Sequence, residues 1–470
     1  MSIRQLRARL AHDESGLGIV EILVSLMIFA IVIIGVTYSM ISMTRLTGDA
    51  SARETATNLA AAEIDRVAAI PDAFNVHDAS TPKQVVVDGI TYNIQTKTGW
   101  VSANGSTGNC GIGAAGGQLQ YKRVNVTVTW DGMYLQNPVR ADTALAPSTR
   151  LNDPTAGTIL VSITRESGEG QAGISVSATK TSGGAGLPDP FDPTDVDGCA
   201  YALKAPPGTY NLTTSMSGYI DTNQQLLPVT QSITVVAGSA TPISLQQDLA
   251  QTYTIKYAAN STRTVKLPTN LDVTYFGQAA ASPLNEAGTA TRKLYPWTVG
   301  YQVIAGNPTT CAAADPERWT ATGTTTGKLA GTRAFKVPGA AGGTGNLPAT
   351  MGVADVVIPG ATSTNFFLTA VASSVTSGGN PGCTAAATTI YKFGSFAGGS
   401  TQTVALPYGT WKLYTGATSG AVTTQITTGV TVRDAAISLD SLGAPLTGIA
   451  PTTSTFASNI LTLDPRMPKP

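Results

Sequence analysis

The chain opens with its most uneven distribution of apolar and polar residues. Residues 17–36, LGIVEILVSLMIFAIVIIGV, are apolar apart from Glu21 and the uncharged Ser25, and the next charge after Glu21 is Arg45. As an α-helix, this stretch rises about 30 Å, which is enough to cross the hydrocarbon core of a bilayer. The pattern predicts a membrane-spanning helix with one carboxylate near its beginning.

The helical pattern continues beyond the apolar run. Ala60, Ile64 and Val67 recur at the i, i+4, i+7 spacing of one helix face. Pro71 cannot continue a helix and is expected to end it. We therefore expect one helix over residues 17–70, about 80 Å long, whose C-terminal part packs on a small sheet.

Strand patterns follow the helix. The run KQVVVDGITYNIQ holds two β-rich segments around Asp88-Gly89, which predicts a hairpin. Val124, Val126, Val128 and Trp130 alternate with polar residues, as in a half-buried strand. We expect residues 17–150 to form one unit, with its sheet over 84–148.

Beyond residue 150 a glycine and an aromatic residue recur before strand-like segments. The glycines of these three pairs are 92 and 109 residues apart, about the length of a β-sandwich. The pairs are Gly208 with Tyr210, Gly300 with Tyr301, and Gly409 with Trp411. We expect β-sandwich modules over 151–249, 250–345 and 346–446 and a tail over 447–470, and the last two modules could be one larger domain. The fold class is thus α+β: a long helix with a small antiparallel sheet, then tandem all-β sandwiches.

Charge places the chain relative to the membrane. Arg4, Arg7 and Arg9 precede the apolar run, so the positive-inside rule keeps the N-terminus cytoplasmic and sends the remaining chain outside. Charged residues make up only 12% and the net charge is zero, so nothing indicates a nucleic-acid partner. A cleaved secretory signal would have a shorter apolar region, and a plain anchor would not explain Glu21.

The four cysteines indicate disulfides rather than metal. No two form a CxxC pair, so a zinc site has little support. An even number of widely spaced cysteines in a chain outside the membrane is typical of disulfide bonds formed in an oxidising compartment. We favour Cys311 with Cys383, because both lie in the C-terminal half. Cys110 with Cys199 is then left by elimination, although the sequence cannot choose among three connectivities.

Other candidate chemistry is weak. With only His77 beyond residue 16, no catalytic triad is expected, and we predict no catalytic residue, cofactor or metal. The GxGxxG match at 111–116 lacks the strand and helix that a nucleotide loop needs. Asp189, Asp192, Asp195 and Asp197 could bind calcium but fail the EF-hand spacing, so a turn is expected. Core burial is the expected role of three tryptophans that could otherwise contact carbohydrate or protein: Trp297, Trp319 and Trp411.

The N-terminus resembles the class III signal of type IV prepilins, including PilV-like minor pilins and pseudopilins. The resemblance rests on the basic leader, Gly16, the apolar run and Glu21 at the fifth position after that glycine. It implies that a prepilin peptidase cuts after Gly16 and methylates the new amine of Leu17. An unpaired carboxylate in lipid is costly, so Glu21 would pair with the Leu17 amine of a neighbouring subunit. Leu17 and Gly18 replace the commoner phenylalanine and threonine or serine.

The segment DVDGCAYALKAPPGTYNLTT, within 151–249, resembles carboxypeptidase-regulatory-like or Cna-B-like modules, which serve as stalks and adhesive arms. Some relatives carry a Lys–Asn isopeptide bond. The first strand here, TILVSIT, has no lysine, so we expect none.

Together the two resemblances imply a large minor type IV pilin, at or near the filament tip, acting in pilus assembly initiation or adhesion. Its expected partners are prepilin peptidase, other pilin subunits, the inner-membrane assembly platform, the membrane through residues 17–41, and a surface ligand or host receptor. It would be a single-pass membrane precursor and later part of a surface pilus. The alternatives are a pseudopilin of a type II secretion or DNA-uptake apparatus and, from another class, a membrane-anchored enzyme.

Overall fold

The computed structural model describes most of the chain between residues 18 and 469. The described residues are 18–79, 81–103, 105, 107–108, 110, 119–133, 137–147, 153–181, 186–278, 283–324, 326–374, 376, 378–384, 388–433 and 453–469. They form two compact units. The first comprises Met1–Thr158 with Val236–Pro242, and the second comprises Ile159–Val235 with Ile243–Pro470.

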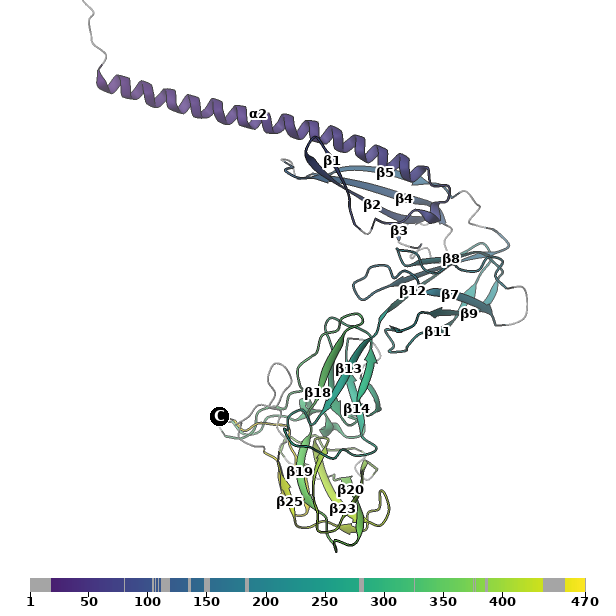
Figure 1. Ribbon diagram of the computed structural model, residues 1–470, viewed down its shortest axis with the longest axis vertical. Helices are drawn as coiled ribbons and strands as arrows, with labels where there is room; N and C mark the ends of the chain where they lie inside the picture. Colours follow the sequence, from purple (N-terminus) through teal and green to yellow (C-terminus); the bar gives the residue numbers. More distant parts are fainter. Residues whose placement is uncertain are drawn as a thin grey trace, which may run out of the picture. The chain divides into compact units, whose positions relative to one another are not determined.

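The first unit is built on one continuous helix, α2 (Ile19–Ala68), which Figure 1 shows as a single unbroken coil. The predicted helix is thereby confirmed to within two residues at its C-terminal end. Its buried residues all lie between residue 49 and the C-terminal end, at the spacing of one face: Asp49, Ala52, Ala56, Ala60, Glu63 and Val67. Residues 19–44, the N-terminal part of α2, make almost no contact with the rest of their unit.

An antiparallel sheet covers the buried face of α2, in the order β1-β2-β4-β5 with β3 paired to β2. Its strands are β1 (Lys83–Val87), β2 (Ile90–Ser102), β3 (Thr107–Gly108), β4 (Leu119–Trp130) and β5 (Val139–Leu145), after a short 3₁₀ helix, η1 (Ala73–Asn75). Val124, Val126, Val128 and Trp130 all face the helix in one apolar core, as the alternation predicted. The helix and this sheet therefore share one apolar core.

The β1–β2 connection is the predicted hairpin. Asp88 and Gly89 both have positive φ, 50° and 79°, between the paired residues Val87 and Ile90. Such two-residue loops match the twist of antiparallel strands, and aspartate followed by glycine suits them best. This local signal fixes the register of the sheet edge.

The second unit begins with a sandwich of two sheets, β10-β12-β6-β8 and β11-β9-β7. Its strands are β6 (Gly157–Thr164), β7 (Ser175–Lys180), β8 (Cys199–Ala205), β9 (Gly208–Ser215), β10 (Tyr219–Asp221), β11 (Val229–Val235) and β12 (Ala240–Leu249). Ile159, Val161 and Ile163 of β6 are fully buried between the sheets, together with Tyr210 and Leu212 of β9.

Two of the three glycine–aromatic pairs share one geometry. Gly208 begins β9 at φ 144° and Gly409 begins β23 (Gly409–Gly416) at φ 142°, a region that favours glycine. Two residues on, the buried aromatic donates a hydrogen bond four residues back, from Tyr210 Oη to Pro206 O at 2.7 Å and from Trp411 Nε1 to Pro407 O at 3.0 Å. The middle pair differs, because Tyr301 precedes its strand and bonds the carbonyl of Tyr295.

Four further sheets complete the second unit: β16-β13-β18, β15-β14-β17, β22-β19-β25, and β21-β20-β23-β27-β26 with β24 on β23. The first two of these sheets contain β13 (Gln251–Tyr257), β14 (Asp272–Phe276), β15 (Leu284–Ala287), β16 (Thr291–Leu294), β17 (Gln302–Ala305) and β18 (Thr344–Ala349). The last two contain β19 (Gly352–Val357), β20 (Asn365–Ala372), β21 (Ile390–Ala397), β22 (Thr401–Leu406), β23, β24 (Thr424–Gln425), β25 (Val430–Val432), β26 (Thr455–Ala457) and β27 (Ile460–Leu463). Between β17 and β18 lie two 3₁₀ helices, η3 (Ala312–Ala314) and η4 (Pro316–Arg318). The predicted α+β fold class, a long helix followed by sandwich-like β-sheets, is confirmed.

The last two sandwiches share core residues. Leu271, Ala305 and Trp319, from the stretch before β18, pack in the same apolar cluster as Trp411. The stretch expected as a tail, 447–470, contains β26 and β27, and β27 pairs with β23. The C-terminal residues are therefore part of the last sheet.

The alanine face of α2 gives a test of the helix–sheet contact. Ala56 is fully buried, so Ala56→Leu forces extra methylenes into a filled core, and we expect it to destabilise the first unit by about 1–3 kcal/mol. Ala61 is exposed on the same helix, so Ala61→Leu should change stability little. Hydrogen exchange of the β2 and β4 amides in the full chain measures both. Equal protection in the two variants would contradict the described packing.

Candidate functional site: the two parts of the N-terminal helix

The N-terminal part of α2 is apolar on all sides. An 18-residue window has a mean hydropathy of 3.0 and none of it is buried in the structure, so the helix is long and apolar enough to cross a membrane. Ile19 is 78% exposed and Phe29 62% exposed. Soluble monomers rarely leave a contiguous apolar surface of this length in water. By length and composition alone, a membrane anchor and a signal sequence both fit.

Glu21 is the one charged residue of this apolar part and lies in its first turn. Its backbone N–H donates to Gly18 O at 2.9 Å, and its carbonyl accepts from Ser25 Oγ at 2.6 Å. Among the described residues, no ion pair involves its exposed carboxylate. The helix N-terminus favours a carboxylate by about 0.3–1 kcal/mol, less than the roughly 2.5–3.5 kcal/mol that a charge costs in a bilayer. A further partner would remove the remaining cost.

The C-terminal part of α2 is held to its sheet by a buried carboxylate. Glu63 Oε1 accepts from Arg66 Nη2 at 2.6 Å and from Thr96 Oγ1 of β2 at 3.4 Å, and Lys83 Nζ of β1 lies 3.5 Å from Oε2. The hydrogen bond from Arg66 lowers the pKa of Glu63, and Lys83 adds to this against the opposing effect of burial. The carboxylate thus ties the helix to two strands.

Where the two parts of the helix meet, a second buried carboxylate, Asp49, lies near the end of β4. Asp49 Oδ2 is 3.6 Å from Arg53 Nε, and the Arg53 guanidinium lies 5.5 Å from the centre of the Trp130 ring. An open cavity of about 460 Å³ is lined here by residues of α2, including Arg45, by Ile90 of β2, by Trp130 of β4 and by residues 131–133 that follow it. These contacts mark the point where α2 leaves its sheet.

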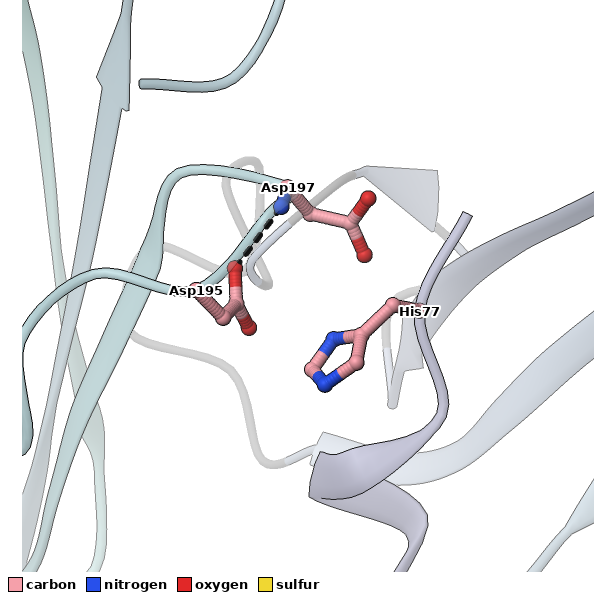
Figure 2. A group of neighbouring side chains, drawn as sticks. All are labelled: His77, Asp195 and Asp197. Carbon is pink, nitrogen blue, oxygen red and sulfur yellow. Dashed lines mark hydrogen bonds between the residues drawn. The ribbon is translucent and has the colours of Figure 1, made fainter. Parts of the chain in front are cut away.

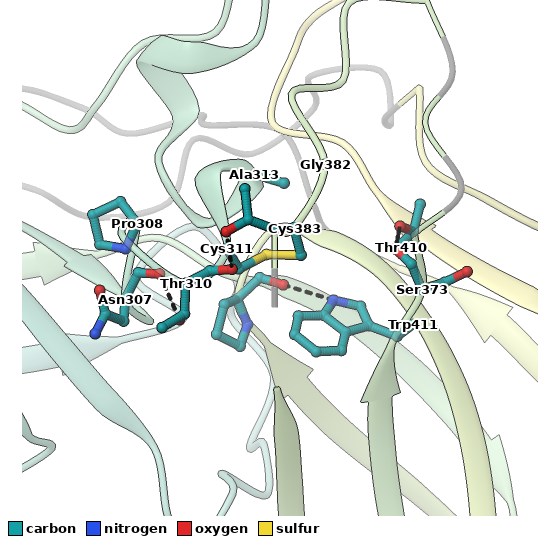
Figure 3. The surroundings of a disulfide bond; sticks show 12 residues. Asn307, Pro308, Thr310, Cys311, Ala313, Ser373, Gly382, Cys383, Thr410 and Trp411 are labelled. Carbon is teal, nitrogen blue, oxygen red and sulfur yellow. Dashed lines mark hydrogen bonds between the residues drawn. A yellow bond between two sulfur atoms is a disulfide. The ribbon is translucent and has the colours of Figure 1, made fainter. Parts of the chain in front are cut away.

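The structure joins Cys311 to Cys383 across 72 residues, which is the pair favoured from the sequence. Figure 3 shows the bond beside Trp411, with Ala313 N donating to Gly382 O at 3.0 Å. Cys110 and Cys199 are each disulfide-bonded as well. Their pairing with each other stays a prediction.

The aspartate-rich loop before β8 forms a turn. Asp195 Oδ1 accepts hydrogen bonds from the backbone N–H groups of Asp197 at 2.9 Å and Cys199 at 2.8 Å, and Figure 2 shows the first of these. The carboxylate therefore caps the chain reversal into the strand. A turn was expected at this position rather than a calcium-binding loop, and the Asp195 carboxylate stabilises such a turn.

Two groups of residues singled out in the sequence remain: the three tryptophans, and residues outside the described part of the chain. Trp319 and Trp411 are fully buried and donate to the carbonyls of Ala313 and Pro407, while Trp297 is partly buried. Their expected core role is confirmed for the first two. Gly16, Leu17 and the glycine motif at 111–116 lie outside the described residues.

One buried ionic cluster was missed from the sequence. Arg466 is 1% exposed, makes two hydrogen bonds to the Asp464 carboxylate, and donates through Nη1 to Thr320 O and Gly378 O. Lys328 Nζ approaches the same carboxylate at 2.7 Å, and the guanidinium lies 5.0 Å from the Trp319 ring centre. The alternating run ILTL before Asp464 was the available signal for a strand there.

Comparison with known proteins adds little to these observations. No family model and no curated protein matches the chain. Solved structures that match include the Bacillus anthracis TIE protein (12% identity, 73% of this chain and 68% of that one, TM-score 0.19). Two others are pilin subunits: the major pilin of Bacillus cereus (12%, 55% and 87%, 0.18) and a streptococcal ancillary pilin (10%, 62% and 97%, 0.15). Scores this low carry no argument, so function must be inferred from the residues themselves.

Acid should loosen the helix–sheet contact through Glu63. Its pKa in the folded chain is below the ordinary 4.5, so the stabilisation is present above that value and is lost as pH falls through the lowered pKa. We expect protection of the first unit against hydrogen exchange to fall below about pH 4.5. Glu63→Gln should make this fall shallower, while Glu54→Gln, exposed on the same helix, should leave it unchanged. Identical acid profiles in all three chains would remove Glu63 from this role.

Proposed function

We propose that this chain is a large minor subunit of a type IV pilus, incorporated at or near the filament tip, where it acts in assembly initiation or adhesion. The observation that carries the proposal is the division of α2. One continuous helix is apolar and exposed over its N-terminal part and packed against a sheet over its C-terminal part. This arrangement suits a segment that first lies in a membrane and then packs among equivalent helices.

The apolar part of α2 needs apolar neighbours both in the membrane precursor and in the assembled filament. In the precursor, lipid supplies it and the chain beyond α2 lies outside the cell. In a filament, the helices of neighbouring subunits replace the lipid. The surface left exposed in the single chain is then the surface used for association, with other pilin subunits and the assembly platform as partners.

Glu21 gives this association a defined register. Cleavage after Gly16 by a prepilin peptidase would create a free, methylated amine on Leu17, four residues before the carboxylate. An amine and a carboxylate on adjacent subunits relieve each other's cost in an apolar surrounding, whereas either alone does not. Docking is thereby favoured only where the two helices are aligned.

The size of the second unit supports a position at the tip. Its described residues form six sheets beyond the one that packs on α2. Stacking such a head at every level of a compact filament is sterically difficult, whereas a terminal position leaves it free to contact a surface ligand. We propose a structural and binding role, without catalysis.

N-terminal sequencing of the exported protein is the direct test of processing. We expect the mature chain to begin at Leu17 with a methylated amine, because Gly16 precedes the apolar run and Glu21 follows at the fifth position. A chain that still begins at Met1, or that begins after residue 40, would exclude the proposal.

Substitution of Glu21 tests assembly separately. We expect Glu21→Ala to insert into the membrane normally, since it removes a charge from the apolar segment, but to be recovered in sheared surface filaments at least about tenfold less than wild type, the effect of about 1.4 kcal/mol. Glu54→Ala, on the packed part of the same helix, should be incorporated normally. Undiminished recovery of Glu21→Ala would refute the register role, and recovery only in cell envelopes, never in filaments, would favour the pseudopilin alternative.

A further inference from the structure

The sandwich formed by β6 to β12 has polar residues at inward-facing positions where alternation calls for apolar ones. Along β9, the inward residues are Tyr210, Leu212 and then Thr214, which is buried. Along β12, Ile243 and Leu245 are followed by buried Gln247. Because side chains alternate between faces, both apolar series end in a polar residue at the same end of the sandwich.

Strand register adds two more polar residues to this end. Asp221 of β10 lies directly opposite Gln247, and Gln231 of β11 lies opposite Leu212. Residues opposite each other in an antiparallel pair place their side chains on the same face. Thr214, Asp221, Gln231 and Gln247, contributed by four strands, therefore converge.

A cavity of about 340 Å³ lies between these residues. It is lined by all four, by further polar residues such as Gln225 and Thr230, and by three apolar residues. Leu212, Val229 and Leu245 are these apolar residues. The volume falls in the range of about 300–1,000 Å³ typical of small-molecule sites.

Gln247, one of the residues that line this cavity, has an unmet hydrogen-bonding group. Its side chain belongs to a residue only 1% exposed, and its Nε2 donates to Thr214 Oγ1 at 2.7 Å. Its Oε1 accepts no hydrogen bond from any residue that the structure describes. A buried acceptor left unpaired costs about 1–3 kcal/mol, so native chains seldom keep one without a use.

We propose that this cavity binds a neutral saccharide unit. Hydroxyl groups can donate to the Asp221 carboxylate, which already accepts from Gln225 N at 2.8 Å and from Asn223 Nδ2 at 3.4 Å but has further lone pairs. The amides and hydroxyls of the lining can donate in return, and the C–H face of a sugar ring can pack on Leu212 and Leu245. The lining contains no lysine, arginine, histidine or aromatic residue, which disfavours anions and aromatic ligands.

The proposal goes beyond a role in a filament and does not depend on it. It rests on one sandwich of the second unit, and its readout does not involve cleavage after Gly16. On a surface-exposed subunit, such a cavity would supply the ligand contact for adhesion.

Binding is measured on the full chain in lipid nanodiscs, free of alkyl-glycoside detergents that would compete. Saturation-transfer NMR and calorimetry with a panel of neutral monosaccharides and their methyl glycosides should find at least one saturable ligand. Because the ligand is uncharged, its affinity should be the same at low and high NaCl. No saturable binding across the panel would overturn the proposal.

Thr214→Val combined with Gln247→Leu locates the site. The double change removes both partners of one hydrogen bond and extends the two apolar series, so the melting temperature should be unchanged or raised while affinity falls at least about tenfold. Gln402→Leu, in the last sandwich, is the matched control and should bind as wild type. Gln231→Leu provides a second variant if the double variant loses its fold.

Two further outcomes would overturn the proposal. Unchanged saccharide binding in the double variant and in Gln231→Leu would place the site elsewhere. Binding of Ca²⁺ alone, with no saccharide, abolished by the double variant, would show that the Asp221 and Gln247 oxygens serve a cation instead. Either result leaves the N-terminal processing test unaffected.

Discussion

The contact between the alanine face of α2 and its sheet is the constraint on which the first unit depends. Ala52, Ala56 and Ala60 have side chains small enough to let the helix backbone approach the strands closely, and Val124, Val126 and Val128 fill the space opposite. The contact ends near Asp49, and nearly all described residues of α2 before it are exposed in the single chain. Association of the apolar part therefore follows from where the packed part stops.

Two carboxylates of the same helix illustrate how surroundings decide the role of a charge. Glu63 is buried but satisfied by Arg66, Thr96 and Lys83, so it stabilises the unit to which it belongs. The Glu21 carboxylate is stabilised only in part, by the N-terminus of its own helix, so a group on another molecule can stabilise it further. The same residue type thus stabilises a fold in one place and promotes assembly in the other.

Structural features that depend on residues close together in the chain could be predicted from the sequence. The long helix, the Asp88-Gly89 hairpin, the alternating strand at Val124 and the glycine–aromatic turns of β9 and β23 all depend on short spacings. The middle pair, Gly300 with Tyr301, has the same residue types as the other two pairs but a different geometry, because Tyr301 lies before its strand rather than two residues into it. The cluster at Arg466 and the convergence of Thr214 with Gln247 join residues far apart in the chain, which periodicity cannot register.

The pairing of β27 with β23 has a consequence for the order in which the protein is made. Thr410 and Trp411 in β23 are paired with residues about fifty positions later, and Arg466 completes the cover over Trp319. Because synthesis proceeds from the N-terminus, the last sandwich stays open until Arg466 has been made. Emergence of residues 461–466, rather than collapse of any earlier segment, then times the closure of this sheet.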